Sequence, residues 1–251
     1  MQLFDLHTHT TYSDGRNTPE EMIHEALERG LMCFGISDHS PTPFDPPGGM
    51  PEGTEKLYAE AIRKLKARFD GKIRLLLGLE QDFWSPAYEE TYDYIIGSVH
   101  YLYKNGSYLA VDDTPEIFEE GVDRLFGGDF LTACECFYDQ EAAVAEKTGC
   151  GIIGHFDLIT KFNEKHHFFD TEASRYKAAR KKALDRLLEK PVIFEINTGG
   201  LFRGWKTGTY PDDETIRYIR ENGGRVILSS DAHRKEAIAW QFEELSGKLK
   251  M

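Results

Sequence analysis

Hydrophobic positions along the chain follow two alternating patterns. Short, nearly continuous apolar runs predict buried strands at residues 3–6, 32–37, 73–79, 92–99, 151–154, 191–196 and 225–229. Between these runs the apolar positions recur with helical periodicity. They predict helices over 18–29, 54–69, from 114 onward, 130–147, 171–190 and 211–222, with a last helix at the end of the chain. The segment Thr18-Pro19-Glu20-Glu21 has the form of a capping box with proline at the first helical position.

Seven strands alternating with helices predict parallel pairing with right-handed crossovers, either as an open doubly wound sheet or as a closed barrel. No glycine-rich dinucleotide fingerprint follows the first strand, where the sequence is His-Thr-His. No change of composition marks a second domain, so residues 1–251 are expected to form one β/α domain. The segment 41–53 is rich in proline and glycine and is predicted to be an active-site loop.

Histidines and acidic residues gather at the carboxyl ends of the predicted strands. Nine such residues are candidate metal ligands: His7, His9, Asp14, His39, Glu80, His100, His155, Asp231 and His233. In parallel α/β folds these strand ends meet at one face, where active sites form. A barrel brings all nine within reach of one centre, whereas an open sheet spreads the outer ones apart. Their distribution therefore favours a barrel.

The spacing of these residues indicates metal binding. Side chains two residues apart on a strand point to the same side, as expected for His7 and His9 and for Asp231 and His233. A lone His-x-His more often binds nothing, but Glu80 at the tip of an apolar strand needs a partner, and a cation would supply one. Nine ligands exceed the needs of one ion and suit two or three divalent ions.

Histidine and carboxylate ligands without cysteine suit zinc, manganese or iron. Such ions hold a nucleophilic hydroxide at neutral pH, so hydrolysis of phosphate esters is the leading chemistry.

Composition limits the partners and the compartment. A net charge of −13 over 251 residues disfavours binding of long nucleic acids. The four cysteines include no Cys-x-x-Cys pair and are interpreted as buried thiols in a reducing compartment. The start of the chain lacks the basic and apolar regions of a signal peptide, and no apolar run approaches the ~20 residues of a membrane helix. A cytoplasmic protein with no membrane partner is expected.

Six short motifs together resemble those of the PHP (polymerase and histidinol phosphatase) superfamily. They are His7-Thr8-His9, Ser37-Asp38-His39, Gly78-Leu79-Glu80, Gly97-Ser98-Val99-His100, Gly154-His155-Phe156-Asp157 and Ser230-Asp231-Ala232-His233. The resemblance implies a distorted seven-stranded β/α barrel, a TIM-like fold, with a trinuclear metal centre. It implies one site of His7, His9, Glu80 and Asp231, a second of His100 and His155 with Glu80 bridging, and a third of Asp14, His39 and His233. Many relatives have histidine where Asp14 stands.

The segment from Glu195 to Leu201, followed by Arg203, is similar to the histidinol-phosphate phosphatase branch, and so is Arg234 directly after Asp-Ala-His. The resemblance implies hydrolysis of L-histidinol phosphate in histidine biosynthesis. Glu80, Asp231 and His233 would serve catalysis, and Asp157 or a metal-bound water would protonate the leaving group. Arg203 and Arg234 are candidate phosphate ligands, with Arg16 and Lys161 as weaker ones, because guanidinium binds phosphate bidentately. Glu195 or Asn197 would hold the amino group of this small substrate. A homodimer is compatible with the sequence.

Three alternatives remain at this stage. The first is a related phosphoesterase acting on another small ester, a nucleotide or phosphotyrosine. The second is an amidohydrolase, which also begins with His-x-His but has eight barrel strands and often a modified lysine. The third is a metal-binding domain without turnover.

Overall fold

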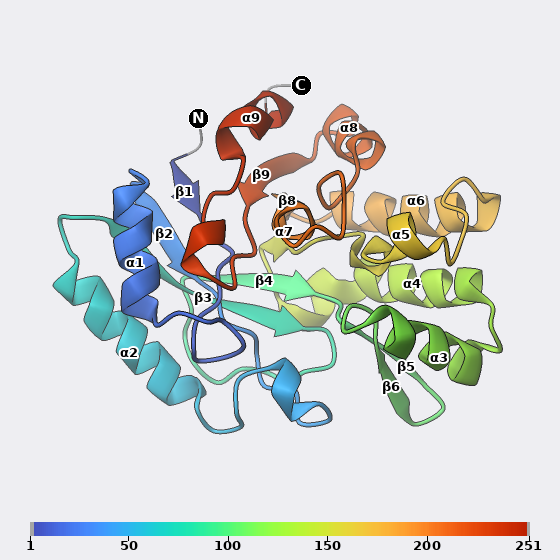
Figure 1. The fold of residues 1–251 in the computed structure, drawn as a ribbon, viewed down its shortest axis with the longest axis horizontal. Helices are drawn as coiled ribbons and strands as arrows, with labels where there is room; N and C mark the ends of the chain where they lie inside the picture. Colours follow the sequence, from blue (N-terminus) through green and yellow to red (C-terminus); the bar gives the residue numbers. More distant parts are fainter. Residues whose placement is uncertain (1–2, 250–251) are drawn as a thin grey trace.

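Seven parallel strands form one sheet at the centre of the molecule (Figure 1). The structure, a computed structural model, describes residues 3–249. The strands lie in the order β1-β2-β3-β4-β7-β8-β9, which follows the order along the chain. Their bounds are Phe4–Asp5 (β1), Cys33–Ile36 (β2), Arg74–Asp82 (β3), Tyr94–Ser98 (β4), Ile152–Ile153 (β7), Ile193–Asn197 (β8) and Arg225–Ser229 (β9). The predicted number and parallel pairing of the strands are confirmed.

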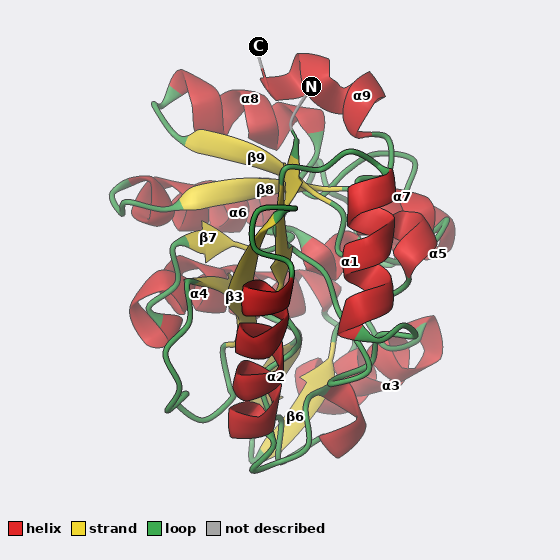
Figure 2. Ribbon diagram, turned by 90° about the vertical axis from the view of Figure 1, so that its left-hand side faces the viewer, coloured by secondary structure: helices red, strands yellow, loops and turns green. Residues whose placement is uncertain are grey.

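The two ends of the sheet meet just beyond β1 and β9. Thr8 forms a parallel bridge with Ala232. The amide of His9 donates to the carbonyl of Ala232 at 2.9 Å, and the amide of Ala232 donates to the carbonyl of His7 at 3.2 Å. The sheet is therefore a nearly closed barrel, as the distribution of histidines predicted, rather than an open sheet (Figure 2).

Helices cover the outside of the barrel. The longer ones are α1 (Pro19–Glu28), α2 (Glu55–Arg68), α3 (Pro115–Phe126), α4 (Phe130–Thr148), α6 (Ser174–Leu188) and α8 (Asp213–Glu221). Single turns form α5 (Asn163–His166), α7 (Gly199–Phe202) and α9 (Phe242–Leu245), and 3₁₀ turns form η1 (Pro46–Gly48), η2 (Leu158–Thr160), η3 (Lys235–Ala237) and η4 (Ser246–Leu249). The capping box of Thr18 and Glu21 is present at the start of α1. In residues 3–249 no helix has the length and apolar character needed to cross a membrane.

The predicted last helix is only the single turn α9, with 3₁₀ turns before and after it, and two further differences lie near the ligands. Strand β3 continues past Leu79 to Asp82, because Glu80, Gln81 and Asp82 keep their pairing with β4. An antiparallel hairpin of β5 (Tyr101–Lys104) and β6 (Ser107–Ala110) follows β4 and was not predicted. Its turn is Asn105-Gly106, with φ of 52° and 81°. Asn-Gly between two strands is a strong hairpin signal, so the sequence contained the information.

Candidate metal centre

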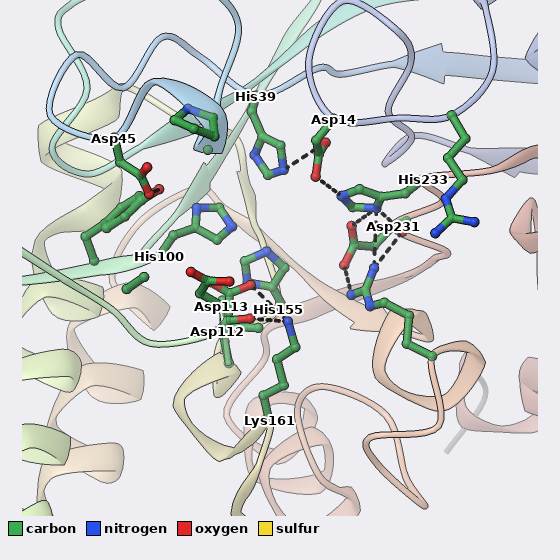
Figure 3. A pocket seen from close by; sticks show the side chains of 17 residues that line it. Asp14, His39, Asp45, His100, Asp112, Asp113, His155, Lys161, Asp231 and His233 are labelled. Carbon is green, nitrogen blue, oxygen red and sulfur yellow. Dashed lines mark hydrogen bonds and ion pairs between the residues drawn. The ribbon is translucent and has the colours of Figure 1, made fainter. Parts of the chain in front are cut away.

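All nine predicted ligands gather at the carboxyl end of the barrel. Six line a cavity of about 530 Å³: Asp14, His39, His100, His155, Asp231 and His233 (Figure 3). The other three, His7, His9 and Glu80, are fully buried. They form ion pairs with five of these six residues, and the ring of His9 stacks on that of the sixth, His233. The strand register explains part of this convergence, since His39 and Glu80 are directly paired in a parallel bridge that extends β2 and β3.

Glu80 occupies the middle of the cluster. Its Oε2 faces three imidazoles, at 2.9 Å from His39 Nδ1, 3.1 Å from His7 Nε2 and 3.4 Å from His9 Nε2. Its Oε1 faces two others, at 3.0 Å from His155 Nε2 and 3.4 Å from His100 Nε2, and accepts a hydrogen bond from Ser98 at 2.6 Å. Each carboxylate oxygen thus faces a different set of histidines, so Glu80 could be shared between two groups of metal ligands.

Electrostatics at the cluster favour a positive charge. Burial would raise the pKa of Glu80, but the surrounding histidines hold it well below its usual range. Burial lowers the pKa of His9 to about 3, assisted by His233 and His39. Burial also acts to lower the pKa of His39, yet Glu80 and Asp14 outweigh it and raise that pKa to about 10. Carboxylates that raise the pKa of a buried imidazole attract cations to the same place.

Four overlapping groups of side chains could each hold an ion, with ligand atoms within 4.8 Å of one another. They are His9, Asp14, His39 and His233; His7, Glu80 and His155; His7, His9 and Asp231; and His39, Glu80 and His100. Within residues 3–249, five buried atoms of these ligands have no hydrogen-bond partner: His7 Nε2, both ring nitrogens of His9, Glu80 Oε2 and His155 Nδ1. A buried polar atom needs a partner, and metal ions would supply one, so these residues fit a multinuclear centre.

Asp14 reaches the cluster from the loop after His9. Its Oδ2 lies 3.0 Å from His233 Nε2, and its Oδ1 lies 3.7 Å from His39 Nε2. The buried carboxylate of Asp38 shapes this loop, because it accepts hydrogen bonds from the amide and hydroxyl of Thr10 and from the hydroxyl of Ser13, each at 2.7 Å. Asp38 is therefore a positioning residue, although its sequence motif drew attention only to its neighbour His39.

Glu195 and Asn197 do not line the cavity, so the expectation that either holds the substrate's amino group needs correction. Both are buried behind the ligands. Glu195 Oε1 accepts from His7 Nδ1 at 2.8 Å, and its Oε2 accepts from the His155 amide at 3.2 Å and from Asn197 Nδ2 at 3.1 Å. Glu195 thus fixes the tautomer of His7 and leaves the His7 Nε2 lone pair facing the cluster.

The candidate phosphate ligands separate into an inner and an outer arginine. Arg203 lines the cavity, where its Nη2 donates to Asp231 Oδ2 at 2.7 Å and its Nη1 lies 3.3 Å from His233 Nδ1. Arg234 is exposed and lies over the ring of Phe202 at 4.6 Å. It lines an adjoining cavity, which shares Arg203, Asp231 and His233 with the first. Of the weaker candidates, Arg16 and Lys161 both line the first cavity.

Asp157, the expected proton donor, does not reach the cluster. It is buried, and it lines a separate cavity with Tyr176 and Lys206. Burial raises its pKa to about 7. A direct proton transfer from Asp157 to a group in the metal-lined cavity therefore has no geometric support.

Four polar residues that line the cavity were not predicted from the sequence: Asp45, Tyr101, Asp112 and Asp113. Asp45 belongs to the predicted active-site loop, and the other three flank the hairpin that was overlooked. The Asn105-Gly106 signal would have placed Tyr101 and Asp112 at the base of a hairpin beside His100.

Comparison with known proteins agrees with this geometry. The PHP domain family matches residues 5–199. A relative named "Probable histidinol-phosphatase" from Deinococcus radiodurans is 31% identical, over 96% of this chain and 90% of that protein. The histidinol-phosphatase of Bacillus subtilis is 25% identical, over 97% of this chain and 98% of that protein. A crystal structure of histidinol phosphate phosphatase from Lactococcus lactis, complexed with zinc, L-histidinol and phosphate, matches with a TM-score of 0.71 and 20% identity, covering 99% of this chain and 93% of that one. The likeness to the crystal structure concerns the fold alone. The family match and the relative from Deinococcus radiodurans show the family from the sequence: the chain belongs to the PHP domain family.

Proposed function

We propose that this protein is a metal-dependent phosphomonoesterase that hydrolyses L-histidinol phosphate to L-histidinol and phosphate. The observation that carries the proposal is that six histidines, three carboxylates and Arg203 lie close together at one cavity. The names of the relatives and the molecules bound to the Lactococcus lactis protein support this substrate.

The four groups of ligands would hold two or three divalent ions. Zinc, present in the Lactococcus lactis structure, heads the candidates, with manganese and iron also suited to histidine and carboxylate ligands. Ions bound here supply positive charge to the phosphoryl oxygens and lower the pKa of water at the site.

The protein's own residues bind and orient the ester. Arg203 reaches into the cavity beside Asp231 and His233, so its guanidinium is placed to bind phosphoryl oxygens. Glu80 and Asp231 lie beside His7 Nε2, where their negative charge would offset that of bound ions, and Glu195 keeps His7 in the tautomer that ligation needs. Arg16 and Lys161 add positive charge at the cavity wall.

Several expectations belong with this proposal. We place the reaction in histidine biosynthesis and the protein in the cytoplasm, where its four free cysteines would stay reduced. Residues 1–251 would act as one domain, and the homodimer stays a prediction. The seven-stranded sheet disfavours the amidohydrolase alternative, which needs eight strands.

The test is a substrate panel with the purified, metal-loaded protein. L-histidinol phosphate, a sugar phosphate, a nucleotide and phosphotyrosine are compared by kcat/KM, before and after treatment with a chelator. Activity should favour histidinol phosphate, disappear with the chelator, and return with added zinc or manganese. His7→Ala should abolish it, whereas His24→Ala, on the exposed face of α1, should not. A stronger preference for another ester would refute the substrate, and full activity in His7→Ala would refute the metal centre.

A further inference from the structure

The walls of the active-site cavity carry opposite charges at different places. Arg203 lies with Asp231 and His233, whereas Asp45, Asp112 and Asp113 belong to the loop 41–53 and to the segment after β6. Figure 3 shows Asp45 and the two adjacent aspartates towards the left of the cavity, with Asp231 and His233 on the right. A ligand that spans the cavity therefore meets the guanidinium of Arg203 on one side and these three aspartates on the other.

Within residues 3–249, only one of these three aspartates has a cationic partner. Lys161 lies 3.2 Å from Asp112 Oδ2 and also donates to the Asp112 backbone carbonyl. In residues 3–249 no lysine, arginine or histidine forms an ion pair with Asp45 or Asp113 within 4 Å. Asp45 is half-buried and Asp113 is exposed, and both border the cavity, so an organic cation in the cavity could pair with either carboxylate.

Asp45 is held in place by several independent contacts. Tyr101, which is almost fully buried, donates its hydroxyl to Asp45 Oδ2 at 2.7 Å. The hydroxyl of Thr42 donates to the Asp45 backbone carbonyl at 2.7 Å. The neighbouring ring of Phe44 stacks on Tyr108 of the hairpin at 3.8 Å and 11°. A Cβ at Gly48 would collide with the Tyr101 hydroxyl, so a glycine is needed for the loop to approach this closely.

These contacts fix a carboxylate at a cavity wall before any ligand arrives, and the ring of Tyr101 lines the same cavity. A preorganised carboxylate beside an aromatic ring is a favourable environment for an organic cation. In L-histidinol phosphate the ammonium stands on the carbon next to the phosphorylated CH₂. An ester whose phosphoryl group lies at the ions and Arg203 therefore carries its positive charge within the same cavity.

We propose that Asp45 and Asp113 are specificity residues that bind the protonated amine of the substrate, with Tyr101 positioning Asp45. The inference rests on the proposed phosphatase activity and extends it. The enzyme selects phosphate monoesters with an ammonium close to the ester bond, and it discriminates against neutral and anionic leaving groups such as nucleosides.

The test compares two small esters that differ by one amine. O-phosphoethanolamine and ethyl phosphate are assayed beside L-histidinol phosphate with the metal-loaded wild type, Asp45→Asn, Asp113→Asn and the double variant. Glu119→Gln removes one charge from α3, away from the cavity, and is the matched control. Each aspartate variant should raise KM for both amine esters about tenfold or more, because a charged hydrogen bond is lost. The kcat/KM for ethyl phosphate should stay within about twofold of wild type.

Two results would overturn the inference. One is a KM for the amine esters that stays within about twofold of wild type in the double variant. The other is an equal loss of activity with ethyl phosphate, since that would mean a role in folding or in metal binding. Wild-type preference for an amine ester other than histidinol phosphate would refute the proposed substrate and still support the two aspartates. Wild-type preference for histidinol phosphate, with no effect in the variants, would support the proposed substrate and refute the role of the two aspartates.

Discussion

Glu195 offers the sharpest test of how the protein prepares its metal ligands. The carboxylate accepts three hydrogen bonds, from His7 Nδ1 at 2.8 Å, from Asn197 Nδ2 at 3.1 Å and from the His155 amide at 3.2 Å. All three partners are donors, so a carboxylate can satisfy them and an amide cannot. Glu195→Gln keeps the size of the side chain and removes this match.

The glutamine has two orientations, and each one costs free energy. With its oxygen towards His7, its NH₂ group faces the donors of His155 and Asn197, and each unsatisfied buried donor costs about 1–3 kcal/mol. With its NH₂ towards His7, Nδ1 must accept, and the proton moves to Nε2, the nitrogen 3.1 Å from Glu80 Oε2. That tautomer cannot ligate a metal through Nε2. We therefore expect metal affinity and kcat to fall about 10- to 100-fold, or about 1.4–2.7 kcal/mol.

Metal affinity is measured by competition of zinc and manganese with a chelator, and kcat is measured at saturating metal. Glu189→Gln, an exposed residue just after α6, is the control for loss of one charge. Glu195→Asp retains the acceptors and should lose less than the glutamine variant. A glutamine variant that binds zinc and turns over like wild type would show that Glu195 does not orient His7.

Three further predictions concern other parts of the molecule. Asp14→Ala should lower the metal bound by about one ion, measured by elemental analysis, because Asp14 belongs to only one of the four ligand groups. Arg203→Lys should lower kcat/KM about tenfold or more, since an ammonium cannot contact Asp231 and a phosphoryl group together as a guanidinium does. Burial, with Asp157 and Asp82 nearby, raises the pKa of Glu141 well above 4.5, and both its oxygens lack partners. Its contribution to stability is complete below pH 4.5 and is lost as the pH rises towards the raised pKa. Metal-free Glu141→Gln should therefore match wild type in urea unfolding at pH 4. Between pH 4.5 and the raised pKa its excess stability should grow by about 1.4 kcal/mol per pH unit.

The barrel was predictable because each central strand is a nearly continuous apolar run between helices with clear periodicity. The end of β3 was misplaced because Glu80 and Asp82 are polar, and apolar periodicity cannot show that polar side chains at an active site continue a strand. The closing contact between Thr8 and Ala232 joins residues at opposite ends of the chain. No local pattern predicts it, since it follows from the curvature of the whole sheet.

The candidate ligands were predictable for a similar reason, because parallel strands place their carboxyl ends at one face. Their supporting residues were not. Glu195 contacts His7 across 188 positions of sequence. It was predicted to bind the substrate because its motif does not show whether the side chain points into the cavity or towards the metal ligands. Asp45 and Asp113 lie in loops without periodicity, so only the folded chain shows that they face the cavity.

Asp231 shows how closure of the barrel and assembly of the site depend on the same contacts. The spacing of Asp231 and His233 predicted that both lie on one side of a strand. Strand β9 ends at Ser229, however, so the alternation of a strand does not bring them together. Asp231 instead has a φ of 51°, a left-handed conformation that costs a residue with a side chain roughly 1 kcal/mol or more. The next residue, Ala232, is bridged to Thr8, and Arg203 binds both the carboxylate and the carbonyl of Asp231. The bridge and the arginine together stabilise this conformation, which places Asp231 Oδ1 3.3 Å from His9 Nε2. The metal-ligand geometry between the first and last strands therefore exists only when the barrel is closed.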